Sequence, residues 1–447
     1  MPLWGQAATA GVRVGAAVDA SVAAATFDSA WTRIRDTHYD TTFNGVDWDA
    51  VRAELRPRAA SARTLSDLRT VLTAMLARLG ESHYSLIPAE VADAVDPTRF
   101  EAGGGRELPG DLGMELRLAG EALVVWRLDG SGPAALAGVR AGWIVSRVAE
   151  AAPDEAIARV RGLAEGPAQR KALTQFLWTM RGRLEGPAGS SVRLEFRDGV
   201  DRVVTRELVR RPRPGEPVRF GNLPTFLAEL SHERILTPNG CIGVIRFNIW
   251  MVPLVARFDR AVDELRSCEG MVIDVRGNPG GIAGMVMGVS GHFLDERVAL
   301  GTMHSRGARL NFVANPRRVN AAGQAVTPYS GPVAILVDGL SVSTSEFFAG
   351  GMQAIGRARI FGERTAGQAL PATLKRLPSG DVLMHVVADF TSPDGSRIEG
   401  RGVIPDEATP LDRAMLLAGR DQAYEAALSW LRGEAARQNA DSGSRSR

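Results

Sequence analysis

The sequence predicts an α/β protein with an N-terminal helical region and an inserted β-rich module. Three patterns support this fold class. Apolar residues recur at helical spacing early in the chain, short strand-like segments follow, and beyond Cys241 apolar strands alternate with helices. A chain of 447 residues has room for two or three such units.

The N-terminal unit is expected to be helical over residues 26–103, after a disordered or flexible stretch over residues 1–25. A second helix should begin at Thr64, because Asp67 in its third position completes a capping box. Gly80 should end that helix, since glycine readily adopts the left-handed conformation found there. The connecting segment then carries the polar residues Glu81, Ser82 and His83.

The module over residues 104–212 is predicted to be rich in strands. A turn at Asp198-Gly199 should join the last two of them. Residues 153–184 are expected to form a helical insert. The predicted strands are residues 122–128, 143–148, 191–196 and 202–208.

The predicted α/β core spans residues 213–433, with buried strands CIGVIRF, MVIDVRG, PVAILVDG and ARIFGE. Helical segments such as residues 258–266 and 345–355 separate them. A final helix is expected to start after Thr409, because proline suits its first position at Pro410. Residues 434–447 are expected to be a flexible tail.

Composition excludes several classes of partner. The chain has 53 Lys and Arg against 51 Asp and Glu, a net charge of +2, so no nucleic-acid partner is expected. No apolar run has the length of a membrane-spanning helix. No clear signal peptide is visible, which by sequence alone favours the cytoplasm. Cys241 and Cys268 allow one disulfide but suggest no metal site.

The segment AILVDGLSVSTSEFFAGGM predicts a buried strand, a tight polar turn and a helix. A serine at such a junction has an exposed hydroxyl, with unpaired backbone N–H groups beside it. Ser343 is therefore a candidate nucleophile, and the Thr344 N–H a candidate donor to an oxyanion. By itself, the segment is explained more simply by hydroxyl side chains that cap the helix.

A GNPGG loop follows the strand MVIDVRG. Its glycines let the backbone approach a ligand closely. Ligand sites in such sheets gather at the carboxyl ends of the strands. The N–H of Gly280 or Gly281 could therefore be the second oxyanion donor, although a lone GNPGG loop is otherwise just a turn.

A serine nucleophile needs a base, and the chain has six histidines. His83 is the best candidate, because it follows a predicted helix end within a polar cluster. The other five lie in segments without nearby carboxylate-rich loops: His38, His232, His292, His304 and His385. The chain has only two lysines, Lys171 and Lys375, so a lysine base is easily tested by elimination.

Several motifs along the chain point to one family. FDSAWTRIRDTHYDTTFNGVDWDAVRAELRP lies in the helical region, SGPAALAGVRAGWIV in the module, and DVRGNPGG, SVSTSE and EGRGVIPD in the core. In this order they resemble the serine peptidases of the C-terminal processing peptidase and tricorn-core family.

The resemblance implies one of two catalytic schemes. In the processing-peptidase branch a lysine occupies the position of Gln368, and neither lysine of this chain matches that position. The tricorn-like branch instead uses a tetrad, which maps the nucleophile onto Ser343, the general base onto His83, and the residues that hold the imidazole onto Ser82 and Glu399. Glu346 and Asp274 are alternative acids.

The resemblance further implies a PDZ-like module and a core of the crotonase-like or ClpP-like layered type. A PDZ-like module would receive a peptide carboxylate at Gly110, Asp111, Leu112 and Gly113, with a purely structural flap as the alternative. Family members often act outside the cytoplasm, so the resemblance leaves an extracytoplasmic location open.

The implied function is hydrolysis of unfolded or C-terminal protein segments through an acyl-enzyme on Ser343, without metal or organic cofactor. A His83 base should lose activity as the pH falls through about 6.5. Two alternatives remain. One is a non-catalytic peptide-binding protein, which Gln368 favours, and the other is acyl-thioester chemistry on a crotonase-like core.

Overall fold

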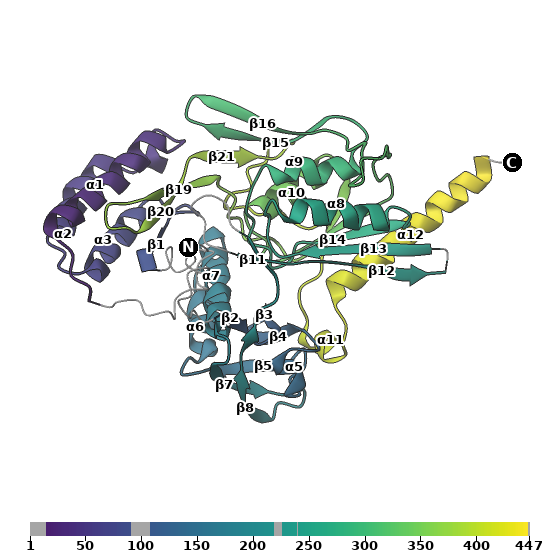
Figure 1. Ribbon diagram of the computed structural model, residues 1–447, viewed down its shortest axis with the longest axis horizontal. Helices are drawn as coiled ribbons and strands as arrows, with labels where there is room; N and C mark the ends of the chain where they lie inside the picture. The colour runs from purple at the N-terminus through teal and green to yellow at the C-terminus, as the bar shows by residue number, and fades with distance from the viewer. Residues whose placement is uncertain (1–14, 91–107, 219–225, 239, 446–447) are drawn as a thin grey trace.

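The computed structural model describes residues 15–90, 108–218, 226–238 and 240–445 (Figure 1). Its N-terminal region contains the helices α1 (Ala20–Thr37), α2 (Trp48–Ala60) and α3 (Leu65–Ala77), which share one apolar cluster. The predicted capping box of Thr64 and Asp67 is present. Asp19 caps α1, so this helix begins within the stretch for which the sequence predicts flexibility. Residues 1–14 and 91–107 lie outside the described residues.

A short strand connects the N-terminal region to the core by pairing with a core strand. β1 (Ser85–Ile87) pairs with β20 (Val382–Val386), which also pairs with β19 (Ala372–Arg376). An ion pair of 2.7 Å between Arg69 and Asp381 supports the same contact. Residues 81–84, just before β1, are therefore held next to the loop that precedes β19.

The module contains a five-stranded antiparallel sheet with the order β3-β4-β5-β7-β8. The predicted helical insert is two helices, α6 (Pro153–Arg161) and α7 (Pro167–Leu184), because the chain turns at Gly166, which has φ 156°. The sheet strands are β3 (Met114–Ala119), β4 (Ala122–Leu128), β5 (Ile144–Val148), β7 (Ser191–Arg197) and β8 (Val203–Val209). Shorter elements are β2 (Pro109–Asp111), β6 (Gly186–Pro187), β9 (Arg211–Pro212) and α5 (Pro133–Leu136).

The core is a six-stranded sheet with the order β12-β13-β14-β17-β18-β22, parallel except for the edge strand β12. Its strands are β12 (Leu230–Thr237), β13 (Gly240–Phe247), β14 (Gly270–Asp274), β17 (Val333–Val337), β18 (Ala358–Gly362) and β22 (Glu407–Ala408). One apolar cluster joins one face to α8 (Leu254–Leu265), α9 (Met285–Ser290) and α10 (Thr344–Ala354), and a second joins the other face to α12 (Gln422–Arg445).

The remaining elements lie around this sheet. β15 (Val298–Ser305), β16 (Ala308–Ala314) and β21 (Ala388–Thr391) form a three-stranded sheet, and β10 (Glu216–Val218) pairs with β11 (Phe226–Ala228). Short helices are η2 (Phe43–Gly45), η4 (Gly291–Phe293) and α11 (Arg413–Leu417).

The predicted start of the final helix at Thr409-Pro410 is wrong. The Thr409 N–H donates to the Gly362 carbonyl at 2.9 Å, continuing the pairing of β22 with β18. A helix instead starts as α11, where the Asp412 side chain accepts the Met415 N–H. α12 then continues to Arg445, through most of the segment predicted to be a flexible tail.

The module contacts the core through a cluster of arginines on one indole. The guanidinium groups of Arg117, Arg246 and Arg276 lie 4.3, 5.1 and 4.8 Å from the Trp126 ring centroid. Arg117 Nε also donates to Asp338 Oδ2 at 2.6 Å. Since Trp126 and Arg117 belong to the module and Asp338 follows β17, this cluster joins the two units.

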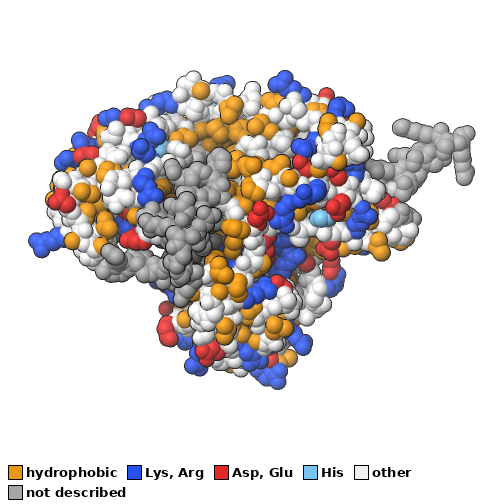
Figure 2. All heavy atoms as spheres, viewed as in Figure 1, with side chains coloured by type: hydrophobic (Ala, Val, Ile, Leu, Met, Phe, Trp, Pro, Cys, Tyr) orange, Lys and Arg blue, Asp and Glu red, His pale blue; other side chains and the backbone are white. Residues whose placement is uncertain are grey.

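Charged side chains of both signs are interspersed over the face seen in Figure 2. Within the described ranges, no helix is both long and apolar enough to span a bilayer.

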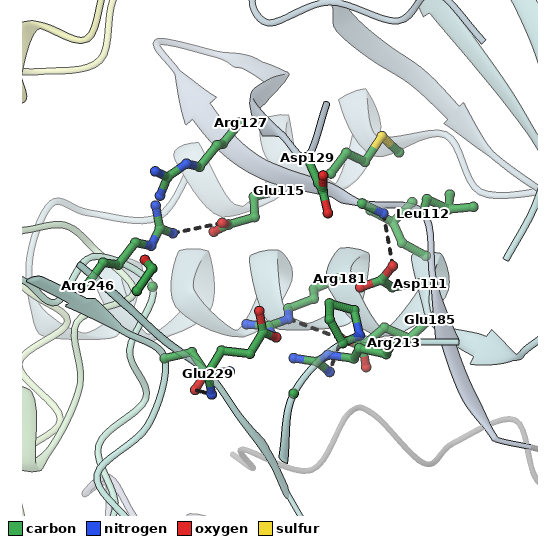
Figure 3. A pocket seen from close by; sticks show the side chains of 18 of the residues that line it. Asp111, Leu112, Glu115, Arg127, Asp129, Arg181, Glu185, Arg213, Glu229 and Arg246 are labelled. Carbon is green, nitrogen blue, oxygen red and sulfur yellow. Dashed lines mark hydrogen bonds and ion pairs between the residues drawn. The ribbon is translucent and has the colours of Figure 1, made fainter. Parts of the chain in front are cut away.

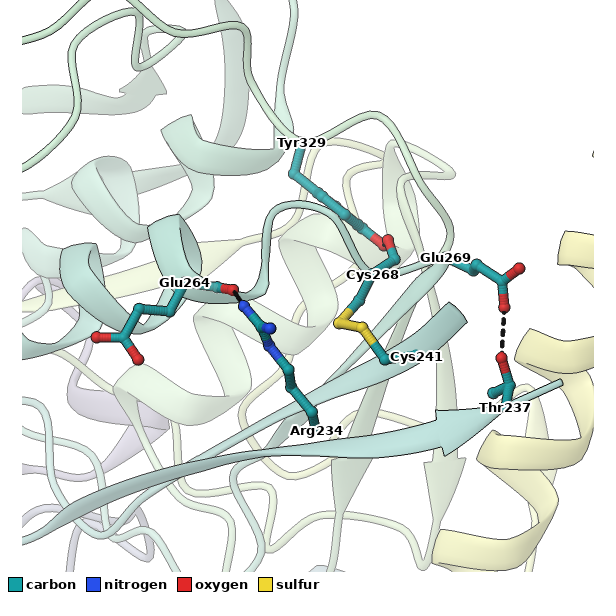
Figure 4. The surroundings of a disulfide bond; sticks show 7 residues. All are labelled: Arg234, Thr237, Cys241, Glu264, Cys268, Glu269 and Tyr329. Atoms are coloured by element: carbon teal, nitrogen blue, oxygen red, sulfur yellow. Dashed lines mark hydrogen bonds between the residues drawn. A yellow bond between two sulfur atoms is a disulfide. The ribbon is translucent and has the colours of Figure 1, made fainter. Parts of the chain in front are cut away.

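Cys241 and Cys268 form a disulfide, the pairing that the sequence allows (Figure 4). It joins the start of β13 to the segment before β14. The Glu269 N–H donates to the Cys241 carbonyl at 2.8 Å, and the Tyr329 hydroxyl donates to the Cys268 carbonyl at 3.0 Å. The bond therefore closes a loop with a sequence separation of 27 residues at one edge of the sheet.

Replacing both cysteines by alanine should lower the free energy of unfolding by about 3 kcal/mol, because the loop is then open in the unfolded chain. Urea denaturation of the wild type and the double variant measures the difference. Reduced wild type is the control and should lose the same amount. Equal stabilities of the oxidised wild type and the double variant would contradict a stabilising role.

Candidate active site

Ser343 is the residue before helix α10, at the junction predicted from the sequence. It has φ 57° and ψ −117°, a conformation that a non-glycine residue adopts only when its surroundings enforce it. Its backbone N–H lies 3.0 Å from both the Gln368 carbonyl and Glu346 Oε2. The turn is thus held by the loop after β18 and by the first turn of its own helix.

The GNPGG loop packs directly on this turn. The Val342 N–H and the Ser345 hydroxyl both donate to the Asn278 carbonyl, at 3.1 and 3.0 Å. A Cβ atom added to Gly280 would lie 2.7 Å from Ser343 Cβ, so only glycine fits there. The two loops predicted to meet at the carboxyl ends of neighbouring strands therefore do meet.

The three candidate oxyanion donors differ in their hydrogen bonding. The Gly280 N–H donates to Asn278 Oδ1 at 3.0 Å. In the described part of the chain, neither the Gly281 N–H nor the Thr344 N–H has a protein acceptor. The geometry therefore favours Gly281 and Thr344 over Gly280 as donors to a ligand.

His83, Ser82 and Glu399 form one hydrogen-bonded chain. Ser82 Oγ lies 2.7 Å from His83 Nδ1 and donates to Glu399 Oε2 at 2.9 Å. Because the single hydroxyl proton of Ser82 goes to Glu399, the network assigns a proton to His83 Nδ1. His83 Nε2 then carries the lone pair, as a general base requires.

Glu399 also accepts the N–H groups of Ser82 and Ala369, at 3.0 and 2.7 Å. Burial raises the pKa of Glu399, opposed by these hydrogen bonds. Three hydrogen-bond donors of the chain thus converge on one side chain that lies in a turn-rich loop of the sequence.

Of the two alternative acids, Glu346 lies beside Ser343. Its carboxylate accepts the N–H groups of Gly367 and Gln368, at 2.8 and 3.0 Å, in addition to that of Ser343. Burial raises its pKa to about 7. Asp274 instead forms a buried ion pair of 2.9 Å with Arg276.

His83 and Ser343 are linked through a series of hydrogen bonds but are not hydrogen-bonded to each other in the described part of the structure. The Ser343 N–H donates to Gln368, and the next residue, Ala369, donates to the glutamate that holds Ser82. His83 is only 8% exposed, and burial lowers the pKa of its imidazole to about 3, with the Lys171 ammonium as a smaller cause. The ring is therefore neutral at pH 7.

Three of the other histidines lie beside carboxylates, contrary to the prediction from their local sequence. His38, His232 and His292 lie 3.0, 2.8 and 2.8 Å from carboxylate oxygens of Glu81, Glu264 and Asp259. The carboxylates come from distant parts of the chain, so local composition could not reveal them.

Sequence reasoning missed two groups around the site. Lys171 of α7 donates to the Glu81 carbonyl at 2.5 Å, although it lies in the module. The Asp338 carboxylate accepts the N–H groups of Gly277 and Leu340 and thereby joins the two loops at Ser343. The only feature of the sequence that could have drawn attention to Lys171 is that the chain has just two lysines. Lys375 is exposed on β19.

A cavity of about 540 Å³ lies between β3 and α7 and opens toward the core (Figure 3). Asp111, Leu112 and Gly113 of the predicted peptide-binding loop line it, whereas Gly110 is packed against Ala188 and Arg210. On its lining, Arg246 Nη2 donates to Glu115 Oε1 at 2.7 Å. No cluster of His, Cys, Asp and Glu suited to a metal ion occurs among the described residues.

Two family models match the chain. Residues 241–409 match peptidase family S41, and residues 23–77 match the tricorn protease C1 domain. The first range contains Ser343, the GNPGG loop and Glu399, and the second contains most of α1 and all of α2 and α3.

Curated relatives extend the match over most of the chain. A carboxyl-terminal-processing protease of Picosynechococcus sp. is 26% identical over 90% of this chain and 87% of its own length. The chloroplastic carboxyl-terminal-processing peptidase 2 of Arabidopsis thaliana is 28% identical over 86% of this chain and 68% of its own length.

Solved structures share the fold. The photosystem II D1 C-terminal processing protease has a TM-score of 0.57 at 23% identity, covering 87% of this chain and 93% of its own. The tricorn protease has a TM-score of 0.50 at 16% identity, covering 93% of this chain and 37% of its own. These structures show the fold. The family models and the processing-protease relatives identify the chain as a serine-type peptidase whose residues 241–409 match peptidase family S41.

Proposed function

We propose that this peptidase cleaves peptide bonds through Ser343, with His83 as general base and Ser82 and Glu399 as the residues that orient the imidazole. The observation that carries the proposal is the hydrogen-bonded chain from His83 Nδ1 through Ser82 Oγ to Glu399. It leaves Nε2 as the proton acceptor, and Gln368 supplies no base in its place because an amide is not basic.

In the proposed reaction, Ser343 Oγ attacks the peptide carbonyl carbon while His83 Nε2 takes the hydroxyl proton. The developing oxyanion lies at the N–H groups of Gly281 and Thr344, which have no protein acceptor in the described structure. The imidazolium then protonates the leaving amine, and the C–N bond breaks. Water, deprotonated by the same imidazole, hydrolyses the acyl-enzyme and restores Ser343.

His83 and Ser343 must also come into hydrogen-bond reach for the first proton transfer. Catalytic hydrogen bonds are often long before substrate binds and shorten in the complex. Gln368 and Ala369 connect the two residues, so a small shift of this loop would change their separation.

The proposed substrates are unfolded or C-terminal protein segments, and we assign the module a PDZ-like peptide-binding role beside a crotonase-like core. The cavity between β3 and α7 supports this, since a peptide could add to the edge of β3 with its carboxylate at residues 111–113. Processing at the carboxyl terminus is what the printed names of the relatives describe. The non-catalytic alternative is disfavoured by those relatives.

Replacing Ser343 by alanine should abolish hydrolysis of casein and labelling by a fluorophosphonate, since both need the activated hydroxyl. His83→Ala should lower both rates by at least about a thousandfold. Ser61→Ala and His232→Ala are the matched controls at exposed and distant positions, and they should behave as wild type. Wild-type hydrolysis by Ser343→Ala would refute the proposed nucleophile.

The acid limb of the pH profile should lie well below 6.5, because burial lowers the pKa of His83 to about 3. At pH 5.5 the enzyme should keep most of its kcat/KM, whereas an unperturbed histidine would be only about 10% neutral. The assay is cleavage of a fluorogenic peptide, with samples returned to pH 7.5 to check that inactivation is reversible. A step in kcat/KM near pH 7 that disappears in Glu346→Gln belongs to the Glu346 carboxyl. A fall in kcat/KM near pH 6.5 that persists in Glu346→Gln would contradict the lowered pKa of His83.

Met114→Glu should weaken capture of peptide carboxylates, because it adds a negative charge on the β3 side of the cavity. We expect KM for a protein with a free C-terminal carboxylate to rise about tenfold, with little change for an amidated C-terminus. Met114→Gln is the matched neutral control. Equal effects on both substrates would argue for a structural flap instead.

A further inference from the structure

Helix α7 presents one face to the segments that carry the proposed catalytic residues. Arg170 Nη2 donates to the Gly400 carbonyl, Lys171 Nζ to the Glu81 carbonyl at 2.5 Å, and Thr174 Oγ1 to the Gly339 carbonyl at 3.0 Å. Positions 170, 171 and 174 share one side of a helix, since residues three and four apart are neighbours there. One helix of the module therefore contacts the chain beside His83, beside Glu399 and upstream of Ser343.

Lys171 occupies the central place on this face. It is one of only two lysines in the chain, and burial lowers its pKa, while the carboxylates of Glu399 and Glu81 oppose that change. The side chain is partly buried, and an ammonium withdrawn from water without partners would be costly. The Glu81 carbonyl and the two nearby carboxylates provide compensation, so the side chain is part of the site and not a solvated surface lysine.

The segment that Lys171 contacts holds a strained residue. His83 has φ 58°, which places a non-glycine residue in the left-handed region and costs of order 1–3 kcal/mol. Such a conformation persists only when contacts on both sides fix it. β1 holds the segment on the carboxyl side of His83. On the amino side, Ser82 is bound to Glu399, and Glu81 is bound to Lys171 through its carbonyl and to His38 and Tyr39 through its carboxylate.

We propose that Lys171 is a positioning residue for His83: it fixes the Glu81 carbonyl from helix α7 and so keeps the imidazole aligned with the Ser343 turn. The proposal rests on the proposed role of His83 as general base. In this scheme Lys171 transfers no proton. It therefore does not take the role of the lysine that the processing-peptidase branch has at the position of Gln368. Its ammonium makes the module part of the catalytic geometry, and Thr174 adds a second, independent contact to the strand-to-helix turn.

Lys171→Met keeps the length and apolar stem of the side chain but removes the donor. Because misplacement of a catalytic group by about 1 Å can cost a hundredfold in rate, we expect kcat for a short fluorogenic peptide to fall ten- to a hundredfold, with KM changed less than about twofold. Lys171→Arg retains a cationic donor and should recover most of that loss. Lys375→Met, at the other lysine, is the matched control and should behave as wild type.

Thr174→Val tests the same face without altering a charge, and Thr179→Val on the exposed side of α7 is its control. Thr174→Val should lower kcat, whereas Thr179→Val should not. Thermal unfolding of each variant shows whether a loss of activity comes from a loss of fold. If Lys171→Met folds and matches Lys375→Met in kcat, while Ser343→Ala and His83→Ala are inactive, the positioning role is wrong and the proposed function stands. If Ser343→Ala and His83→Ala stay active, the proposed function itself fails.

Discussion

Three consecutive backbone N–H groups, those of Gly367, Gln368 and Ala369, donate to one buried and one partly buried carboxylate, and the geometry of the candidate site depends on this arrangement. Gly367 and Gln368 donate to Glu346, and Ala369 donates to Glu399. Glu346 also accepts the N–H of Ser343, and Glu399 that of Ser82. One short segment therefore sets the separation between the strained serine turn and the strained histidine segment.

Removing either carboxylate from water costs free energy, so each needs hydrogen-bond donors in this loop conformation. Burial raises the pKa of each, to about 7 for Glu346. Each remains tolerable because it accepts several N–H or O–H groups, and removing one partner would leave a buried acceptor at a cost of about 1–3 kcal/mol. Competing loop conformations would have to break several of these bonds together, so this hydrogen-bond network holds the two strained residues in place.

The local part of this architecture could be predicted from the sequence. Apolar runs identified β13, β14, β17 and β18, and the Thr64 capping box identified α3, because these signals need only neighbouring residues. The serine turn and the GNPGG loop could be placed together because parallel strands end at the same edge of a sheet. The link of Ser82 to Glu399 was implied only by resemblance, since no spacing connects residues so far apart.

Non-local contacts explain what the sequence did not reveal. The pairing of β1 with β20 brings His83 to the core, and nothing in a three-residue strand specifies its partner. The same holds for Lys171 at Glu81 and for Arg117 at Asp338, where each partner lies in a different unit. The wrong helix start at Thr409 has a similar cause. Thr409 and Pro410 suit the start of a helix, but this segment instead continues the strand pairing with β18.

The environment of Gln368 bears on which residue acts as the proposed general base. Its carbonyl accepts the Ser343 N–H and its own N–H donates to Glu346, so its backbone is used fully at the nucleophile. Its side-chain Nε2, however, is buried and has no hydrogen-bond partner among the described residues. A lysine at this position would bring a charge toward two carboxylates and the hydroxyl, whereas the amide brings neither charge nor basicity. In the proposed mechanism the proton of Ser343 therefore goes to a group outside this loop, His83, whose Nδ1 is hydrogen-bonded to Ser82.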